Sequence, residues 1–250
     1  QISPLPLPDP LPILSLFGPS GNHPTRVRNP PFPRSHEPQW QQFPWKFAKG
    51  RRNVTLTKAQ INSLANNNFG GEVPPWFGSL PNLRVLDLSS NSFVGGIPTS
   101  LFNASKLESI SIMFNQVQGN IPREIGNLGN LKILRMANNQ LTGFIPLTLF
   151  NISSLQIVNL TNNTLTGDLP VNLCSELSNL QEFYLSSNKL SGQILSRFDN
   201  CSELRELSLS SNVLSGTLPR EIGNLTMLKV LSLGQNNFAG NFTFPLLSSV

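Results

Sequence analysis

Apolar and polar positions recur along this chain in one fixed order from about residue 64 onward. Residues 83–98 read LRVLDLSSNSFVGGIP, and the order LxxLxLxxNxLxGxIP returns every 24 residues, with one interval of 25. Self-similarity at this period is typical of a solenoid, in which each coil packs only on its neighbours. The repeated asparagines are Asn67, Asn91, Asn115, Asn139, Asn163, Asn188, Asn212 and Asn236.

Each coil is expected to contain one short strand. In the coil that begins at Leu131, Leu134 and Met136 alternate with Ile133 and Arg135, which is the period of a strand with one buried face. The apolar residues of one coil cannot all be buried within it, so the coils must stack and share a core. Each buried aliphatic side chain then contributes on the order of 1.5–3 kcal/mol. Stacking also places the strands in one long parallel sheet.

The repeated asparagine and glycine have separate tasks. The asparagine is expected to be buried where the coil turns, because its amide can satisfy backbone groups of its own coil and of the neighbouring coil. Leaving such a group unpaired costs roughly 1–3 kcal/mol. The glycine four positions later permits a backbone angle that a side chain would obstruct. We therefore predict a ladder of asparagine side chains along the bend of the solenoid.

The GxIP half of the repeat is similar to the plant-specific class of leucine-rich repeat over residues 64–250. The stretch NNNFGGEVPPWFGSLPNLRVLDLSSNSFVGGIPTSLFN further resembles the ectodomains of plant receptor-like kinases, especially the subfamily of flagellin and elongation-factor sensors. The resemblance implies an α/β-type solenoid, with a concave parallel β-sheet and a 3-10 or irregular convex side. We expect this leucine-rich repeat domain to span residues 59–250, with about eight repeats, the last incomplete.

Residues 1–58 do not follow the pattern. Residues 1–52 hold 12 of the 21 prolines and seven basic against two acidic residues, net +5, so the rest of the chain, which is also +5 as a whole, has no net charge. This composition predicts a disordered segment rather than a basic arm that binds nucleic acid.

Translation out of frame is a third interpretation of this segment. QWQQFPWKFAKG, residues 39–50, can be encoded so that a shift of one nucleotide gives SGNNFHGNLPKE, with glycine at the repeat position now held by Trp45. Ala59 and Asn62 still miss leucine positions, whereas the pattern fits from Leu64 onward. The nucleotide sequence would decide the question. The repeat begun at Leu228 is also incomplete at Val250, so we expect truncation at both ends.

Few residues here support catalysis. Residues 53–250 contain no histidine and two cysteines, so a Ser-His-Asp or Cys-His arrangement has no base and a zinc site has too few ligands. We expect no enzyme activity, metal or cofactor, and the kinase domain of full-length family members is absent. No uninterrupted run of 18 apolar residues occurs, so no membrane span is expected.

Two features bear on the cell compartment. Cys174 and Cys201 lie 27 residues apart in consecutive coils, where a disulfide would add roughly 3–4 kcal/mol; two buried free thiols are the alternative. Asn-x-Ser/Thr acceptors favour a secreted, glycosylated surface, although the LxNxS consensus would also align several of them. The candidates are Asn103, Asn151, Asn159, Asn162, Asn200, Asn224 and Asn241.

A ligand is expected on the exposed strand positions of the concave sheet, which form a rigid platform. Those positions are mainly small and polar, and exposed aromatic, Met and Arg side chains among them are typical of interface cores. The candidates are Met113, Phe114, Ile133, Arg135 and Tyr184, with Glu182 and Glu206 as an acidic rim for a basic peptide. The alternative is that the apolar members only stabilise adjacent strands. A sugar on Asn159 would obstruct the same face.

The resemblance implies an extracellular, ligand-binding domain of a receptor-like kinase or receptor-like protein at the plasma membrane, in signal perception or defence. Its partners would be a peptide or protein ligand and a co-receptor kinase of the same repeat class. A secreted inhibitor of cell-wall-degrading enzymes is one alternative, and a gene fragment without function is another.

Overall fold

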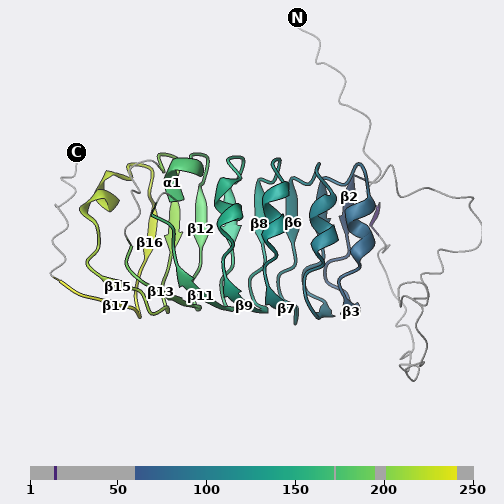
Figure 1. Cartoon of the computed structure of the whole chain (residues 1–250), viewed down its shortest axis with the longest axis horizontal. Helices are drawn as coiled ribbons and strands as arrows, with labels where there is room; N and C mark the ends of the chain where they lie inside the picture. The colour runs from purple at the N-terminus through teal and green to yellow at the C-terminus, as the bar shows by residue number, and fades with distance from the viewer. Residues whose placement is uncertain (1–13, 16–59, 172, 195–200, 241–250) are drawn as a thin grey trace, which may run out of the picture.

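The computed structural model describes residues 14–15, 60–171, 173–194 and 201–240. The described residues between 60 and 240 wind into stacked coils, which run from β2 to β17 along the long axis of the view in Figure 1. Strands form one side of the stack, and short helices lie in front of them in that view. The predicted solenoid with a parallel sheet and a 3-10 side is thus confirmed.

The main sheet has nine parallel strands, and eight of them come one from each coil. These eight are β2 (Ile61–Ser63), β4 (Val85–Asp87), β6 (Ser109–Ser111), β8 (Ile133–Arg135), β10 (Ile157–Asn159), β12 (Glu182–Tyr184), β14 (Glu206–Ser208) and β16 (Val230–Ser232). The ninth, β1 (Leu14–Ser15), pairs with β2 and was not predicted. The rest of the predicted disordered segment, residues 1–58, lies outside the described residues.

A second row of strands follows the asparagines and was also not predicted. Its members are β3 (Gly70–Glu72), β5 (Ser92–Val94), β7 (Gln118–Asn120), β9 (Gln140–Phe144), β11 (Thr164–Asp168), β13 (Lys189–Ser191), β15 (Ser215–Gly216) and β17 (Asn237–Phe238). Strands β7, β9, β11 and β13 form one parallel sheet along the lower edge of the stack in Figure 1. The backbone is therefore hydrogen-bonded from coil to coil on two sides.

Within the described residues, six coils return through a short helix on the side away from the main sheet. The 3-10 helices are η3 (Pro75–Ser79), η4 (Thr99–Asn103), η5 (Arg123–Asn127), η6 (Leu147–Asn151) and η8 (Arg220–Asn224). A proline precedes each of them at the N-cap, where its fixed φ and missing N–H fit the turn. The coil with the extra residue has a short α-helix instead, α1 (Leu173–Glu176).

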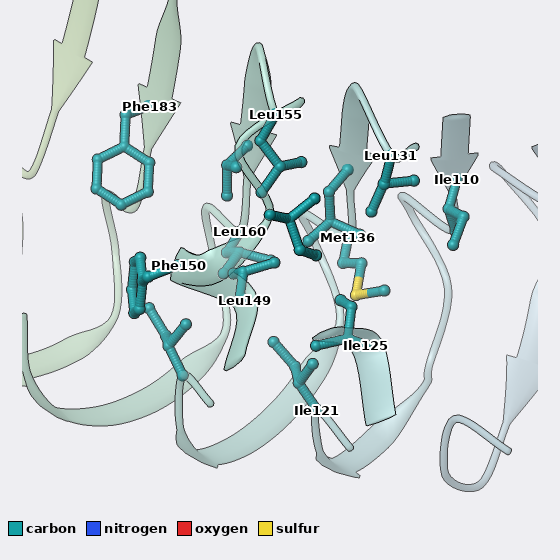
Figure 2. Packing of buried hydrophobic residues seen from close by; sticks show 14 of the residues in the cluster. Ile110, Ile121, Ile125, Leu131, Met136, Leu149, Phe150, Leu155, Leu160 and Phe183 are labelled. Atoms are coloured by element: carbon teal, nitrogen blue, oxygen red, sulfur yellow. The ribbon is translucent and has the colours of Figure 1, made fainter. Parts of the chain in front are cut away.

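The side chains between the sheet and the helices form one continuous core. Figure 2 shows Leu131 and Met136 from a strand-bearing segment together with Ile125 and Leu149 from the helical side, all directed into the same interior. The pattern of alternation predicted for β8 is confirmed, because Leu134 is buried and its neighbours on the strand are partly exposed.

The predicted asparagine ladder is confirmed in atomic detail. Asn139 Nδ2 donates to the carbonyl oxygens of Met136 (3.2 Å) and Ile112 (2.9 Å), and its Oδ1 accepts from the backbone N–H of Val117 (3.0 Å). Ile112 and Val117 belong to the preceding coil, so each asparagine joins two coils. The same set recurs from Asn91 to Asn236, and Asn67 donates within its own coil.

The backbone needs positive φ at two positions of every coil. The predicted glycine adopts it, and at Gly143 an added Cβ would also meet Asn120 Oδ1. The second position, directly before each ladder asparagine, was not predicted; its φ lies between 54° and 57° in all eight coils.

The structure decides between the two alternatives for the cysteines. Cys174, in α1, and Cys201 form a disulfide with a Cα–Cα distance of 4.9 Å. Both side chains are buried. The bridge therefore joins the coil that contains α1 to the next one.

Asn62 is an exception in the core and gives a stability prediction. It pairs in register with the buried Leu86, is 6% exposed, and its Nδ2 has no hydrogen-bond partner among the described residues. Because an unsatisfied buried group costs about 1–3 kcal/mol, Asn62→Leu is expected to raise the free energy of unfolding by a similar amount. Urea denaturation of the full chain measures this.

The exposed Asn68 provides the matched control. Asn68→Leu removes an amide that water already solvates, so no gain in stability is expected. An Asn62→Leu variant no more stable than the parent would contradict the prediction.

Candidate functional site

The register of the main sheet aligns exposed side chains into rows that cross the strands. One row contains Ile133, Ile157, Glu182 and Glu206, and the next contains Arg135, Asn159, Tyr184 and Ser208. A third row lies two residues after the strands β4, β6 and β10 and consists of Ser89, Met113 and Thr161. Met113 is the only long side chain among these three. Six of the seven ligand-binding candidates therefore lie in these rows between β6 and β14, and Phe114 lies directly after Met113, at the turn that precedes Asn115.

The first group of candidates, which we name the Phe114 patch, comprises Met113, Phe114, Ile133 and Arg135. It spans β6 and β8, where Arg135 pairs in register with Ser111. Phe114 is 53% exposed, whereas the other three are partly buried. Arg135 forms no ion pair within the described part of the chain. The patch thus combines apolar surface with an uncompensated guanidinium.

The second group, the Tyr184 patch, comprises Glu182, Tyr184 and Glu206 on β12 and β14. The Tyr184 hydroxyl donates to Glu206 Oε2 at 2.5 Å, and Glu182 lies directly beside Glu206 in register. Burial raises the pKa of the Tyr184 hydroxyl, and its hydrogen bond to Glu206 raises this pKa further. Tyr184 therefore stays a neutral donor, and the patch is acidic.

A cluster of three charged side chains at the edge of the same sheet was not predicted from the sequence. Arg84 Nη1 and Lys132 Nζ contact the two oxygens of Glu108 at 2.5 Å and 2.8 Å. The hydrogen bond from Lys132, followed by the one from Arg84, lowers the pKa of the Glu108 carboxyl. The three residues are spaced by 24 positions, which is the signal that would have predicted their contact.

The asparagine acceptors fall on both sides of the solenoid. Asn103, Asn151 and Asn224 are exposed at the ends of η4, η6 and η8, on the convex side away from the main sheet. Asn159, in β10, lies between the two patches. Asn200 and Asn241 are outside the described residues.

We expect glycans on the three convex acceptors and none on Asn159. Asn159 is partly buried in the sheet, and its Oδ1 accepts from the Thr161 backbone N–H at 3.1 Å, which holds the amide close to the backbone. Glycopeptide mass spectrometry of the chain secreted from plant cells measures the occupancy of each site. A sugar on Asn159 would contradict the prediction and would also obstruct the face between the patches.

Other kinds of site find no support in the described ranges. No group of three or more His, Cys, Asp or Glu side chains there is arranged to hold a metal ion. In the same residues, no helix has the length and apolar character needed to cross a bilayer.

Comparison with known families agrees with this geometry. The family model described as Leucine Rich Repeat matches residues 63–80, 82–104, 130–152, 154–175, 179–201 and 203–225, more than half of the chain. The chain belongs to the leucine-rich repeat family. No curated protein matches this leucine-rich repeat chain by sequence.

Solved leucine-rich repeat structures include plant receptor kinase ectodomains. The ectodomain of GASSHO1/SCHENGEN3 from Arabidopsis thaliana, in complex with CASPARIAN STRIP INTEGRITY FACTOR 2, is 39% identical with a TM-score of 0.71, over 75% of this chain and 23% of that chain. Arabidopsis HAESA, in complex with the peptide hormone IDA and the co-receptor SERK1, is 31% identical with a TM-score of 0.70, over 73% of this chain and 30% of that chain.

A plant ice-binding protein has the same fold, at 30% identity and a TM-score of 0.65, over 74% of this chain and 59% of that chain. The leucine-rich repeat chain thus spans about a quarter to a third of the two receptor ectodomains. The resemblance to receptor-kinase ectodomain repeats is confirmed, and this fold is a binding module. The flagellin and elongation-factor subfamily stays a prediction.

Proposed function

We propose that this chain is part of the extracellular, ligand-binding region of a plant receptor-like kinase or receptor-like protein, and that it binds a peptide on the concave face between β6 and β14. The observation that supports this most is the presence of the exposed Phe114 and the partly exposed Arg135, Tyr184, Glu182 and Glu206 on one outward face, whose other positions are mainly Ser and Asn, with Ile157 the exception. Aromatic and Arg side chains are enriched among the residues that dominate binding energy.

Two further observations support the proposal. The GASSHO1/SCHENGEN3 and HAESA ectodomains were solved with a bound factor or peptide hormone, and HAESA with a co-receptor as well. We therefore extend the proposal to a co-receptor kinase as second partner. The disulfide between Cys174 and Cys201 and the exposed convex acceptors suit an oxidising, extracellular compartment.

A bulky substitution on the concave face tests the proposal. A library of random dodecapeptides is selected on the full chain, and the affinities of the selected peptides are measured by fluorescence anisotropy. Ser109, on β6 beside Ile133, is partly buried in the face. Ser109→Trp is expected to weaken peptide binding at least about tenfold, a loss of roughly 1.4 kcal/mol, because the indole would occupy the platform.

Thr99→Trp is the control, because Thr99 is exposed in η4 on the opposite side. It should leave peptide affinity unchanged, and both variants should melt close to the parent temperature. Equal affinity of the parent and Ser109→Trp for every selected peptide would refute the proposed binding face.

A further inference from the structure

Phe114 occupies a position where the fold itself favours a different residue. The residue before each ladder asparagine has a left-handed backbone, and Phe114 has φ 54°. Bulky side chains are rare in this region, whereas Asn and other short polar residues adopt it more readily. The other seven coils have only Asn, Ser or Gln there: Asn66, Ser90, Asn138, Asn162, Ser187, Ser211 and Gln235.

The exposure of the Phe114 ring to solvent is also unfavourable for the stability of the fold. More than half of its surface is in contact with solvent, and its neighbours in the same row, Ser90 and Asn138, are shorter. An unfavourable backbone together with an exposed ring gains nothing for the fold. Residues of this kind concentrate at ligand sites, where a partner covers the exposed surface.

The charge next to this ring is uncompensated. Arg135 forms no ion pair among the described residues. Glu108, an acidic residue in the adjacent coil, is already paired with both Arg84 and Lys132. A partner that covers Phe114 and Met113 with an apolar side chain would therefore be expected to bring a carboxylate to Arg135.

The Tyr184 patch has the opposite imbalance. Glu182 and Glu206 lie side by side on adjacent strands, an arrangement that repels, and neither has an ion pair within the described ranges. The Tyr184 hydroxyl donates its hydrogen bond to Glu206. A cationic side chain from the partner would relieve the repulsion.

The distance between the two patches constrains the partner further. Arg135 on β8 and Tyr184 on β12 are two strand steps apart, with β10 between them, or about 9.6 Å at the usual strand spacing. Three residues of a polyproline II backbone span about 9.3 Å and return to the same side. In a β-strand the side chains at i and i+3 point to opposite faces.

We propose that the concave face recognises an extended peptide with an apolar side chain beside a carboxylate, followed or preceded at three residues by a cationic side chain. The apolar group covers Phe114 and Met113, the carboxylate pairs with Arg135, and the cation lies above β12, two strand steps from Arg135, where it reaches Glu182 and, on the next strand, Glu206. This inference rests on the proposed function and specifies the ligand of that site.

The test compares peptide selections on two forms of the full chain. Dodecapeptides selected on the parent are expected to share an acidic and a basic residue three positions apart, with an apolar residue next to the acidic one. The variant Arg135→Glu, Glu182→Arg, Glu206→Arg should select the same separation with the signs exchanged. Arg135→Gln alone, which retains the acidic patch, should lose only the preference for the acidic residue.

Phe114→Asn adds a measurement that separates recognition from stability. It is expected to raise the melting temperature, since asparagine suits the left-handed backbone, and to weaken a selected peptide at least tenfold. Asn66→Ser, at the same coil position but two coils away, should leave affinity unchanged.

The outcomes distinguish this inference from the proposed function. Selected peptides that are sensitive to Ser109→Trp but lack the charge pair, or keep its signs on the exchanged variant, would overturn the inference alone. Peptides insensitive to Ser109→Trp would overturn both. A Phe114→Asn variant that binds as tightly as the parent would remove the role of the ring.

Discussion

Replacement of Asn188 by alanine is expected to lower the free energy of unfolding by at least about 3 kcal/mol. Its Nδ2 donates to the carbonyl oxygens of Leu160 and Leu185 at 3.0 Å each, and its Oδ1 accepts from the Leu165 N–H at 3.0 Å. The side chain is buried, so water cannot replace these partners without opening the coil. Each orphaned group costs roughly 1–3 kcal/mol, and three groups are affected. Urea denaturation of the full chain measures the change.

Asn162→Ala is the matched control for this substitution. Asn162 is exposed in the preceding coil and donates to Asn138 Oδ1 at 2.8 Å. Loss of one exposed hydrogen bond, together with alanine in the left-handed backbone at position 162 (φ 54°), should lower the free energy of unfolding by only about 1 kcal/mol. Similar losses for Asn188→Ala and Asn162→Ala would show that the ladder does not stabilise the stack in the way described.

Removal of the disulfide is expected to have an effect of similar size. The double variant Cys174→Ala, Cys201→Ala leaves no free thiol and opens a loop with a sequence separation of 27 residues. On the chain-entropy estimate this loop contributes roughly 3.5 kcal/mol, because the bridge restricts the unfolded chain. The parent and the double variant should therefore differ in urea midpoint under oxidising conditions.

Reduction provides the control for the double variant. With dithiothreitol present throughout the titration, the unfolded parent is reduced, and its midpoint should fall close to that of the double variant. The double variant itself should not respond to dithiothreitol. A parent whose midpoint is the same with and without reductant would mean that the bridge does not contribute to stability.

The parts of the fold that the sequence predicts are those fixed by repeated backbone geometry. The asparagines form the predicted ladder because the coil turns at the same residue each time, and the glycines after them have the predicted positive φ. Strand β1, the second row of strands and α1 were not predicted, since two or three extended residues leave no distinct apolar period. For the cysteines, the variable half of the coil has no fixed geometry from which a distance could be calculated.

The sequence predicts which side chains of the strands point outward, and their role in binding stays a prediction. Alternation along each strand predicted that Ile133, Arg135, Glu182 and Tyr184 point away from the core, and these positions of β8 and β12 are partly exposed. The hydrogen bond of Tyr184 to Glu206 and the left-handed backbone of Phe114 could not be derived, because they depend on rotamers and on a turn that also accepts Asn and Ser.

The ladder has a direction that affects how this chain is made. The turn around Phe69 is satisfied by Asn91, whose Oδ1 accepts from the Phe69 N–H at 3.0 Å and whose Nδ2 donates to the Leu64 carbonyl at 2.8 Å. During translation the N-terminal part of a protein emerges and folds first. Each turn that leaves the ribosome therefore lacks the side-chain partners of its backbone groups until the asparagine of the next coil has also emerged. Folding of the nascent polypeptide thus follows its synthesis with a delay of one coil.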